Sequence, residues 1–345
     1  MRLLSQSFIT NNFASLAMKQ QTRSAKNIFL PNFKLLSLIV CSLVYGCSSS
    51  GDDIYETDTF SSASVVNIPK DPQTEQPEIT RHVENKITVL FIYSSDFANE
   101  YRDNTQLRLQ QLINTANQSF ADSTLPVEFQ IAGTVEVEYD KFNSDMDLIT
   151  QLTCDLDTLQ IKGDCIRDEN FSFVSSLRSS SKADIISFVR PYHSSSLNTC
   201  GLGWVTGAGT NGDLSNPLWK ETAVNIINVD GPCTEWTFSH EIGHNLGLNH
   251  GSLQDNEGGV YPWAWGYGEY NSFSTIMTYQ SVYGYESQRI YRFSNPNQVC
   301  MNSSCGIPQS EANAADAVSA LNITIPQVAN NEISVVDLLS YDISE

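Results

Sequence analysis

The chain has 345 residues, more than one ordinary domain needs, and it carries 39 acidic side chains against 19 basic ones, a net charge of −20. Such a surface repels nucleic acid and anionic membranes, which excludes a nucleic-acid-binding role. The same charge keeps an exported protein soluble, and we expect a monomer.

The first segment, residues 1–46, contains five Lys or Arg and no Asp or Glu, and it ends in an apolar run at 35–46. This run is too short to span a bilayer comfortably, so it predicts a signal peptide. The stretch before it is long, and a true start at Met18 would leave an ordinary basic n-region. Without residues 1–46 the chain keeps 14 basic and 39 acidic side chains, a net charge of −25.

The apolar run ends at Cys47, and serines follow. Residues 44–47 resemble a bacterial lipobox, in which the cysteine becomes an acylated amino terminus, although Tyr45 stands where small residues are usual. The resemblance implies an outer-membrane lipoprotein of a bacterium, attached to the membrane only through Cys47; free secretion is the alternative. Residues 47–85 are polar and lack hydrophobic periodicity, so we expect a disordered tether or a short propeptide.

Strands and helices are expected to alternate from residue 86 onward. Lys86–Ser94 is apolar and β-branched, which suits a buried strand. Helical spacing follows Asn104 and Thr105, either of which can cap a helix. The other candidates are strands at 127–139, 183–189, 201–205 and 223–229, and helices at 145–156, 170–177 and 234–248. This alternation predicts an α/β fold.

Six cysteines remain beyond the signal segment and Cys47. An even number in an exported chain indicates disulfides rather than metal-binding thiols. Six cysteines allow 15 connectivities. We favour the local pairing, Cys154 with Cys165, Cys200 with Cys233 and Cys300 with Cys305.

Two acidic stretches of the chain are candidates for calcium-binding loops. Neither Asp145 with Asp147 nor residues 255–259 forms a complete EF-hand pattern. A Ca²⁺ site is possible in principle but unsupported, and the expectation is that these carboxylates are solvated.

The most informative stretch is HEIGHNLGLNH, from His240 to His250. His240 and His244 lie four residues apart, so on a helix both rings can bind one ion. Gly247 lets the chain leave the helix and return with His250 as a third ligand. Three imidazoles with an open fourth position are typical of a catalytic Zn²⁺ site rather than a closed structural one.

The segment Ser274–Tyr279 adds a methionine turn after this motif. The two together resemble the metzincins, a clan of zinc endopeptidases. The resemblance implies a twisted, mostly parallel sheet with helices, above a small irregular lower subdomain, with the zinc cleft between them. It also implies protein or peptide substrates, with Met277 packed beneath the zinc ligands.

The resemblance is narrower with the bacterial reprolysin-like (adamalysin-like) metzincins. These carry a similar GLAxV segment, their substrate-binding edge strand, at the position of Gly201, Leu202, Gly203, Trp204 and Val205. The alternative for this segment is an interior strand. Arg292–Pro296 and a helix at Glu311–Leu321 resemble the closing segment of that family, which gives a catalytic domain at 86–325 and a tail at 326–345.

Two positions depart from the animal reprolysins: Gly251 stands in place of Asp, and Tyr279 in place of Pro. A tyrosine at Tyr279 is similar to astacins and serralysins, where it can be an additional zinc ligand. Here it could instead donate a hydrogen bond to the oxyanion, or only pack.

Peptide-bond hydrolysis by a zinc-activated water, with Glu241 as general base, is the function these residues favour. Two alternatives remain open. One is a non-catalytic zinc-fold adhesin or binding lipoprotein, which the intact Glu241 disfavours. The other is a zinc hydrolase of a non-protein substrate, which the strand-like 201–205 segment disfavours.

Overall fold

The structure is a computed structural model that describes residues 83–139, 143–153, 169–193, 199–255 and 257–329. All of them belong to one of the two units into which the chain divides, Arg81–Glu345. None of the helices in these ranges is long and apolar enough to cross a membrane. The predictions for the signal segment, Cys47, the tether and the Cys154–Cys165 pair lie outside the described residues.

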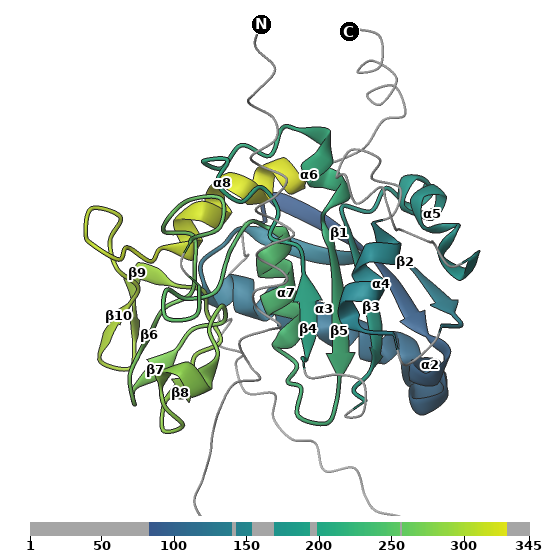
Figure 1. Cartoon of the computed structure of the whole chain (residues 1–345), viewed down its shortest axis with the longest axis horizontal. Helices are drawn as coiled ribbons and strands as arrows, with labels where there is room; N and C mark the ends of the chain where they lie inside the picture. The colour runs from purple at the N-terminus through teal and green to yellow at the C-terminus, as the bar shows by residue number, and fades with distance from the viewer. Residues whose placement is uncertain (1–82, 140–142, 154–168, 194–198, 256, 330–345) are drawn as a thin grey trace, which may run out of the picture. The chain divides into compact units, whose positions relative to one another are not determined.

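A five-stranded sheet forms the centre of the described unit (Figure 1), with the strand order β2-β1-β3-β5-β4. Its strands are β1 (Asn85–Ser94), β2 (Val127–Val137), β3 (Ile185–Pro191), β4 (Gly201–Gly203) and β5 (Val224–Val229). All neighbouring pairs are parallel except β4, which runs antiparallel to β5 at the edge. Every residue of β3 and β5 is buried, as expected for parallel strands covered on both faces.

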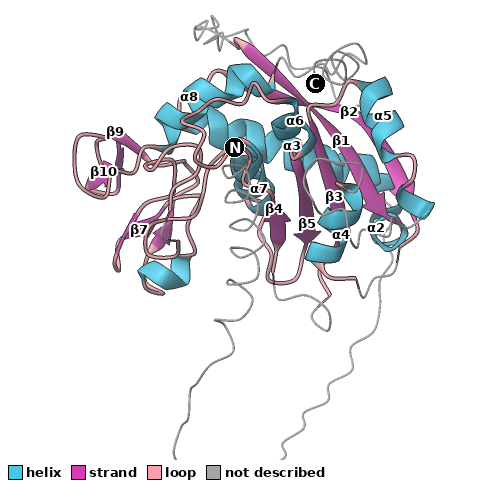
Figure 2. Cartoon of the chain, turned by 45° about the horizontal axis from the view of Figure 1, so that its top comes forward, coloured by secondary structure: helices cyan, strands magenta, loops and turns pink. Residues whose placement is uncertain are grey.

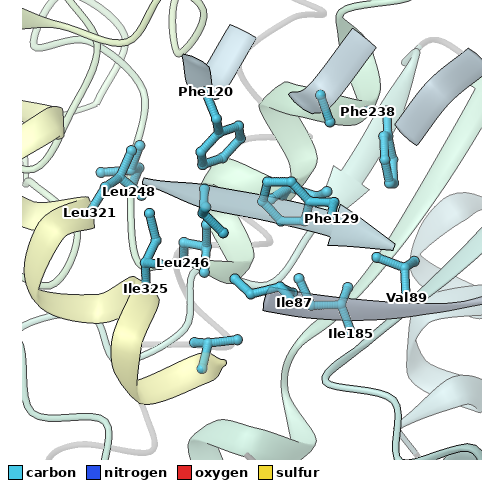
Figure 3. Close-up of a cluster of buried hydrophobic side chains, with 14 of the residues drawn as sticks. Ile87, Val89, Phe120, Phe129, Ile185, Phe238, Leu246, Leu248, Leu321 and Ile325 are labelled. Atoms are coloured by element: carbon cyan, nitrogen blue, oxygen red, sulfur yellow. The ribbon is translucent and has the colours of Figure 1, made fainter. Parts of the chain in front are cut away.

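Helices cover both faces of the sheet because side chains along a strand alternate in direction. Ile87 and Val89 of β1 pack with the first core cluster, whereas Leu90 and Ile92 pack with the second. The first cluster includes α3, α7 and α8, and the second includes α4 and α5. Figure 2 shows helices on both sides of the strands, and Figure 3 shows the first cluster with Phe120 and Phe129 beside the strands.

The expected elements of this upper part are present with small changes in their ends. The helices and 3₁₀ turns are α2 (Ser95–Tyr101), η1 (Arg102–Asn104), α3 (Thr105–Asp122), α4 (Asp145–Leu152), η4 (Glu169–Phe171), α5 (Val174–Ser181), α6 (Pro217–Glu221) and α7 (Thr237–Asn245). Asn104 precedes α3 as expected, but its side chain makes no capping hydrogen bond. Ser144 and Asp147 form a capping box that begins α4.

The lower part follows α7 in the chain and contains short strands and loops, as the metzincin resemblance implies. Its elements are β6 (Gly268–Glu269), β7 (Phe273–Ser274), η5 (Gln280–Tyr283), β8 (Gln288–Arg289), β9 (Asn295–Cys300) and β10 (Ser303–Cys305). Strands β6, β7 and β8 form one small sheet, and β9 and β10 form a hairpin. In Figures 1 and 2 these strands lie on the side of α7 away from the large sheet.

The predicted helix at 311–321 was placed too early, since the last helix is α8 (Ala317–Val328). Ala315 pairs with Ile307 in a β-bridge, so the preceding residues are held in a loop. Asp316 then caps the helix by accepting a hydrogen bond from the N–H of Ser319 at 3.1 Å. Leu321 of α8 lies beside Leu248, which follows α7 in the chain, and both belong to the first core cluster (Figure 3).

Candidate metal centre and active site

The helix of the histidine motif, α7 (Thr237–Asn245), is shorter than the predicted 234–248. Its start is delayed because the preceding residues form turns, which close with hydrogen bonds such as Thr237 N–H to the Thr234 carbonyl at 3.0 Å. Both His240 and His244 remain inside the helix, one turn apart, so their rings leave it on one face.

The helix ends in a C-terminal turn that brings the third histidine back. The N–H of Gly247 donates to the His244 carbonyl, and that of Leu248 to the Gly243 carbonyl, both at 2.9 Å. Gly247 has φ +91°, and a Cβ there would lie 2.3 Å from a valine methyl group. Only glycine suits this position, as the spacing predicts, and His250 follows it three residues later.

The three histidines converge on one point. The Nε2 atom of His250 lies 3.2 Å from the Nε2 of His244 and 3.2 Å from the Nε2 of His240. Nitrogen ligands about 2.0–2.1 Å from a tetrahedral Zn²⁺ stand about 3.3 Å apart. The donor set and its spacing therefore fit a zinc ion, and this is the one histidine, cysteine and carboxylate cluster of that kind among the described residues.

The outer nitrogen of each ring is fixed by an acceptor, which leaves Nε2 unprotonated and able to bind a metal. The Nδ1–H groups donate to the Ile276 carbonyl from His240 at 2.8 Å, to the Leu248 carbonyl from His244 at 2.9 Å, and to the Asp255 carboxylate from His250 at 2.9 Å.

Burial keeps His240 and His244 neutral, the form that binds metal. Desolvation, with the nearby His250 as the next cause, lowers the pKa of His240 to about 3. Desolvation also lowers the pKa of His244 well below its ordinary value, with His250 and His240 adding to the effect.

Glu241 lies on α7 beside the histidines, and its carboxylate is buried against β4. Its Oε2 has no hydrogen-bond partner. Burial, followed by the charge of Asp145, raises the pKa of Glu241 well above its ordinary value. A Cβ at Gly201 would lie 2.6 Å from Oε1 of Glu241, and one at Gly203 would lie 3.2 Å from Oε2. The two glycines of the predicted substrate strand therefore also make room for this carboxylate.

The segment Gly201–Val205 lies at the edge of the sheet rather than in its interior. Only Gly201–Gly203 forms a strand, and it pairs on one side with β5. Among the described residues no strand pairs with its other side. Leu202 and Trp204 pack against the second core cluster. Among the described strands, β4 is therefore paired along one backbone edge only.

A disulfide ties β4 to the histidine helix. Cys200, directly before β4, is bonded to Cys233, four residues before α7. The second described disulfide, Cys300–Cys305, closes the hairpin of β9 and β10. Both pairs are those that local pairing predicts.

Met277 and Tyr279 differ in their exposure at the site. Met277 is fully buried, and its sulfur would lie 2.5 Å from a Cβ at Gly243, so the methionine packs directly on the backbone of α7. Tyr279 is 52% exposed, and its ring centroid lies 4.9 Å from that of His250. Desolvation of the hydroxyl, followed by the charge of Glu241, raises the pKa of Tyr279 above its ordinary value.

The expectation that the acidic stretches are solvated is wrong for two carboxylates. Asp145 is 6% exposed and accepts a hydrogen bond from the buried guanidinium of Arg190 at 2.6 Å. Asp145 also accepts from Thr199, next to the β4 disulfide. Asp255 orients His250. The partner of Asp145 is 45 residues away in sequence, and that of Asp255 lies five residues away across a turn. Composition alone reveals neither contact.

The role of Asp255 as a partner of His250 is not evident from the sequence motif. The sequence indicates this role only by an acidic residue five positions after His250, in a segment that also contains Gly258 and Gly259. A search for a carboxylate acceptor for each predicted histidine ligand would have found this candidate.

Comparisons with known proteins agree with this geometry. A peptidyl-Asp metalloendopeptidase from Pseudomonas aeruginosa is 36% identical over 172 residues, covering 46% of this chain and 28% of that protein. A peptidyl-Asp metalloendopeptidase from Xanthomonas campestris pv. campestris is 25% identical over 263 residues, covering 76% of this chain and 56% of that protein. The chain thus spans about half or less of the length of these relatives.

Solved structures add a likeness of fold. A chain in the "Structure of a chaperone-substrate complex" aligns with a TM-score of 0.52 and 17% identity, over 72% of this chain and 35% of that chain. The sequence profile described as Metallo-peptidase family M12 matches residues 83–294, which include the sheet, the three histidines and the methionine turn. The chain therefore belongs to metallopeptidase family M12.

Proposed function

We propose that the protein is a zinc-dependent endopeptidase in which Glu241 is the general base. The observation that carries this proposal is the convergence of three unprotonated Nε2 atoms beside a buried carboxylate that has an oxygen without a partner. His240, His244 and His250 would hold the ion. Family membership and the relatives' activity as metalloendopeptidases support the same conclusion.

When bound, zinc would polarise the scissile carbonyl and acidify a water molecule. Glu241, with its raised pKa, is a strong proton acceptor; it would take the proton from that water and deliver it to the leaving amine. Tyr279 would donate a hydrogen bond to the developing oxyanion, because its ring lies beside His250 and its hydroxyl stays protonated at neutral pH.

The free edge of β4 would bind the substrate as an added antiparallel or parallel strand. Main-chain hydrogen bonds would hold an extended peptide with little dependence on its sequence. Because β4 lies close to Glu241, such a peptide would lie next to the proposed general base.

The relatives suggest a preference for one residue type. Two metalloendopeptidases similar to this chain are named for peptidyl-Asp. We therefore extend the proposal to cleavage next to aspartate.

The test uses casein, or a mixture of peptides, with and without a chelator. Digestion that stops on chelation and returns with Zn²⁺ is expected. Glu241→Ala should bind about one equivalent of zinc and lose activity by several orders of magnitude, because the ligands remain and the base does not. Near-normal turnover in that variant would refute the role of Glu241. Zinc binding without any digestion would favour a non-catalytic adhesin or binding protein. Activity on non-protein substrates alone would favour a zinc hydrolase of a different substrate class.

We further propose that the protein is exported, cleaved before Cys47 and anchored in the outer membrane through an acyl chain on that cysteine. The apolar run at 35–46 and the lipobox-like residues 44–47 support this location. The parent protein should partition with membranes and carry a lipid on its amino-terminal peptide, and Cys47→Ser should lose both. A soluble parent cleaved at another position would leave free secretion as the location.

A further inference from the structure

Arg289 and Arg292 are half-buried arginines of the described unit that have no carboxylate partner among the described residues, unlike three other arginines of the unit. Three arginines have carboxylate partners: Arg108 with Glu235 at 2.6 Å, Arg178 with Glu221 at 3.8 Å and Arg190 with Asp145 at 2.6 Å. Arg289 is also partly buried, but its side chain makes one hydrogen bond, to the neutral hydroxyl of Thr234 at 3.4 Å. Within the described ranges no carboxylate pairs with it, in a chain that has 39 acidic residues.

The strand that carries Arg289 is held against the site. Strand β8 runs parallel to β7, with Arg289 opposite Ser274, two residues before Ile276. The carbonyl of Ile276 is the one that fixes His240. Next to β8, the ring of Tyr291 stacks on Trp236 at 3.8 Å between centroids. These contacts join β8 to the start of α7.

The side chain of Arg289 points toward α7 rather than toward the lower hairpin. Its neighbour Ile290 packs with Phe273 and the Cys300–Cys305 disulfide in the third core cluster. Adjacent residues of a strand face opposite sides, so Arg289 faces away from that cluster. The hydrogen bond to Thr234 is consistent with this direction.

The guanidinium lies within reach of a substrate residue at the metal centre. Arg289 lies opposite Ser274 in the β7–β8 pair, two residues before Ile276, whose carbonyl contacts His240, and two residues span at most about 7 Å. An extended substrate advances about 3.3 Å per residue, and its side chains reach further sideways. A side chain one or two positions from the scissile bond can therefore meet Arg289.

We propose that Arg289 determines substrate specificity by binding the carboxylate of an acidic side chain, aspartate first, beside the scissile bond. This inference rests on the proposed endopeptidase function. A guanidinium offers two parallel N–H donors that match a carboxylate, and the weak contact with Thr234 is easily replaced. The local positive charge also offsets the repulsion that a strongly acidic protein exerts on an acidic substrate.

The test compares two fluorogenic peptides that differ only in Asp or Asn at the cleavage site, with the full-length protein loaded with zinc. The parent should prefer the Asp peptide in kcat/KM by about 10- to 100-fold, the range of a charge-assisted hydrogen bond. Arg289→Gln should reduce this ratio to near one while the rate on the Asn peptide stays within about twofold. Arg289→Glu should favour a Lys peptide over the Asp peptide.

Arg292→Gln is the matched control, because it removes the same charge three residues further along. It should leave the Asp preference intact, and an equal loss in Arg292→Gln would assign the preference to the general field rather than to Arg289. A parent that cleaves both peptides equally, or an Arg289→Gln variant that keeps the preference, overturns the proposal.

Zinc content and thermal unfolding report whether the variants fold. If Arg289→Gln does not fold, Arg289→Lys decides, since it keeps the charge but loses the planar fork: a partial loss of the Asp preference supports the proposal and an unchanged ratio contradicts it. Peptide binding separates this proposal from the endopeptidase proposal. If the parent cleaves neither peptide, the endopeptidase proposal is refuted. The role of Arg289 is then tested by binding: Glu241→Ala protein must bind the Asp peptide more tightly than the Asn peptide, and equal binding refutes that role.

Discussion

Replacing Gly201 by alanine should disable the general base without removing the metal. The added Cβ would lie 2.6 Å from Oε1, 2.8 Å from Cγ and 2.9 Å from Cδ of Glu241. Ordinary contacts require about 3.5 Å, so the carboxylate or the strand must move by roughly 0.9 Å. A misplacement of about 1 Å at a reacting group can cost about a hundredfold in rate. We therefore expect kcat to fall by about 100-fold.

The assay measures kcat and KM on one peptide, together with zinc content, for Gly201→Ala and for Gly133→Ala. Gly133 is the matched control: it lies in β2 of the same sheet, and a Cβ there would meet its nearest atom at 3.5 Å, an ordinary contact. The control should stay within about twofold of the parent. Full kcat in Gly201→Ala with normal zinc content would refute the inference that β4 and Glu241 share this space. A change in KM alone would place the effect in substrate binding.

Three further predictions follow from the contacts of the metal centre. Asp255→Ala should weaken zinc affinity by about 10- to 100-fold, because His250 loses the acceptor that fixes its ring. Competition with a zinc-sensitive dye measures this affinity. An unchanged affinity would show that the contact does not support zinc binding. Tyr279→Phe should lower kcat by roughly tenfold to a thousandfold at similar KM if the hydroxyl stabilises the oxyanion, whereas unchanged kcat would leave Tyr279 as a packing residue. In metal-free protein, the lowered pKa values of His240 and His244 mean that below pH 6.5 the unfolded chain takes up protons that the folded chain does not. Stability should therefore decrease as the pH is lowered below about 6.5, and for His240 this loss should continue to about pH 3, at up to about 1.4 kcal/mol per pH unit. His240→Gln should reduce the slope of the melting temperature against pH, and equal slopes would contradict the shift.

The parts of the site that sequence predicts are those governed by local geometry. The spacing of His240 and His244 fixes their common face once the segment is helical, and Gly247 fixes how the helix ends. The apolar, β-branched run of β1 predicts a buried strand in the same way. The two described disulfides join neighbouring cysteines along the chain, at separations of 33 and 5 residues, as the favoured pairing predicts.

The parts that sequence does not predict depend on contacts between distant segments. Asp145 looks like a surface carboxylate until β3 brings Arg190 to it, 45 residues away in sequence. Likewise, Arg289 is one basic residue among many until β8 is placed beside α7. The start of α8 was misjudged for a related reason: the bridge between Ile307 and Ala315 overrides local helical preference.

The arrangement of β4 and α7 explains why substrate strand and general base can act together. Gly201 and Gly203 face Glu241, so the carboxylate rests on the strand that would hold the peptide. The Cys200–Cys233 disulfide ties the beginning of that strand to the segment before α7, and the Asp145 carboxylate, held by Arg190, receives a hydrogen bond from the residue before Cys200. Because the disulfide fixes the strand to the start of the helix and Asp145 fixes Thr199, two residues before the strand, to β3, a peptide added to β4 would meet Glu241 in a position that the fold itself determines. A side-chain selector such as Arg289 can then lie in the lower part of the molecule, since main-chain alignment does not depend on it.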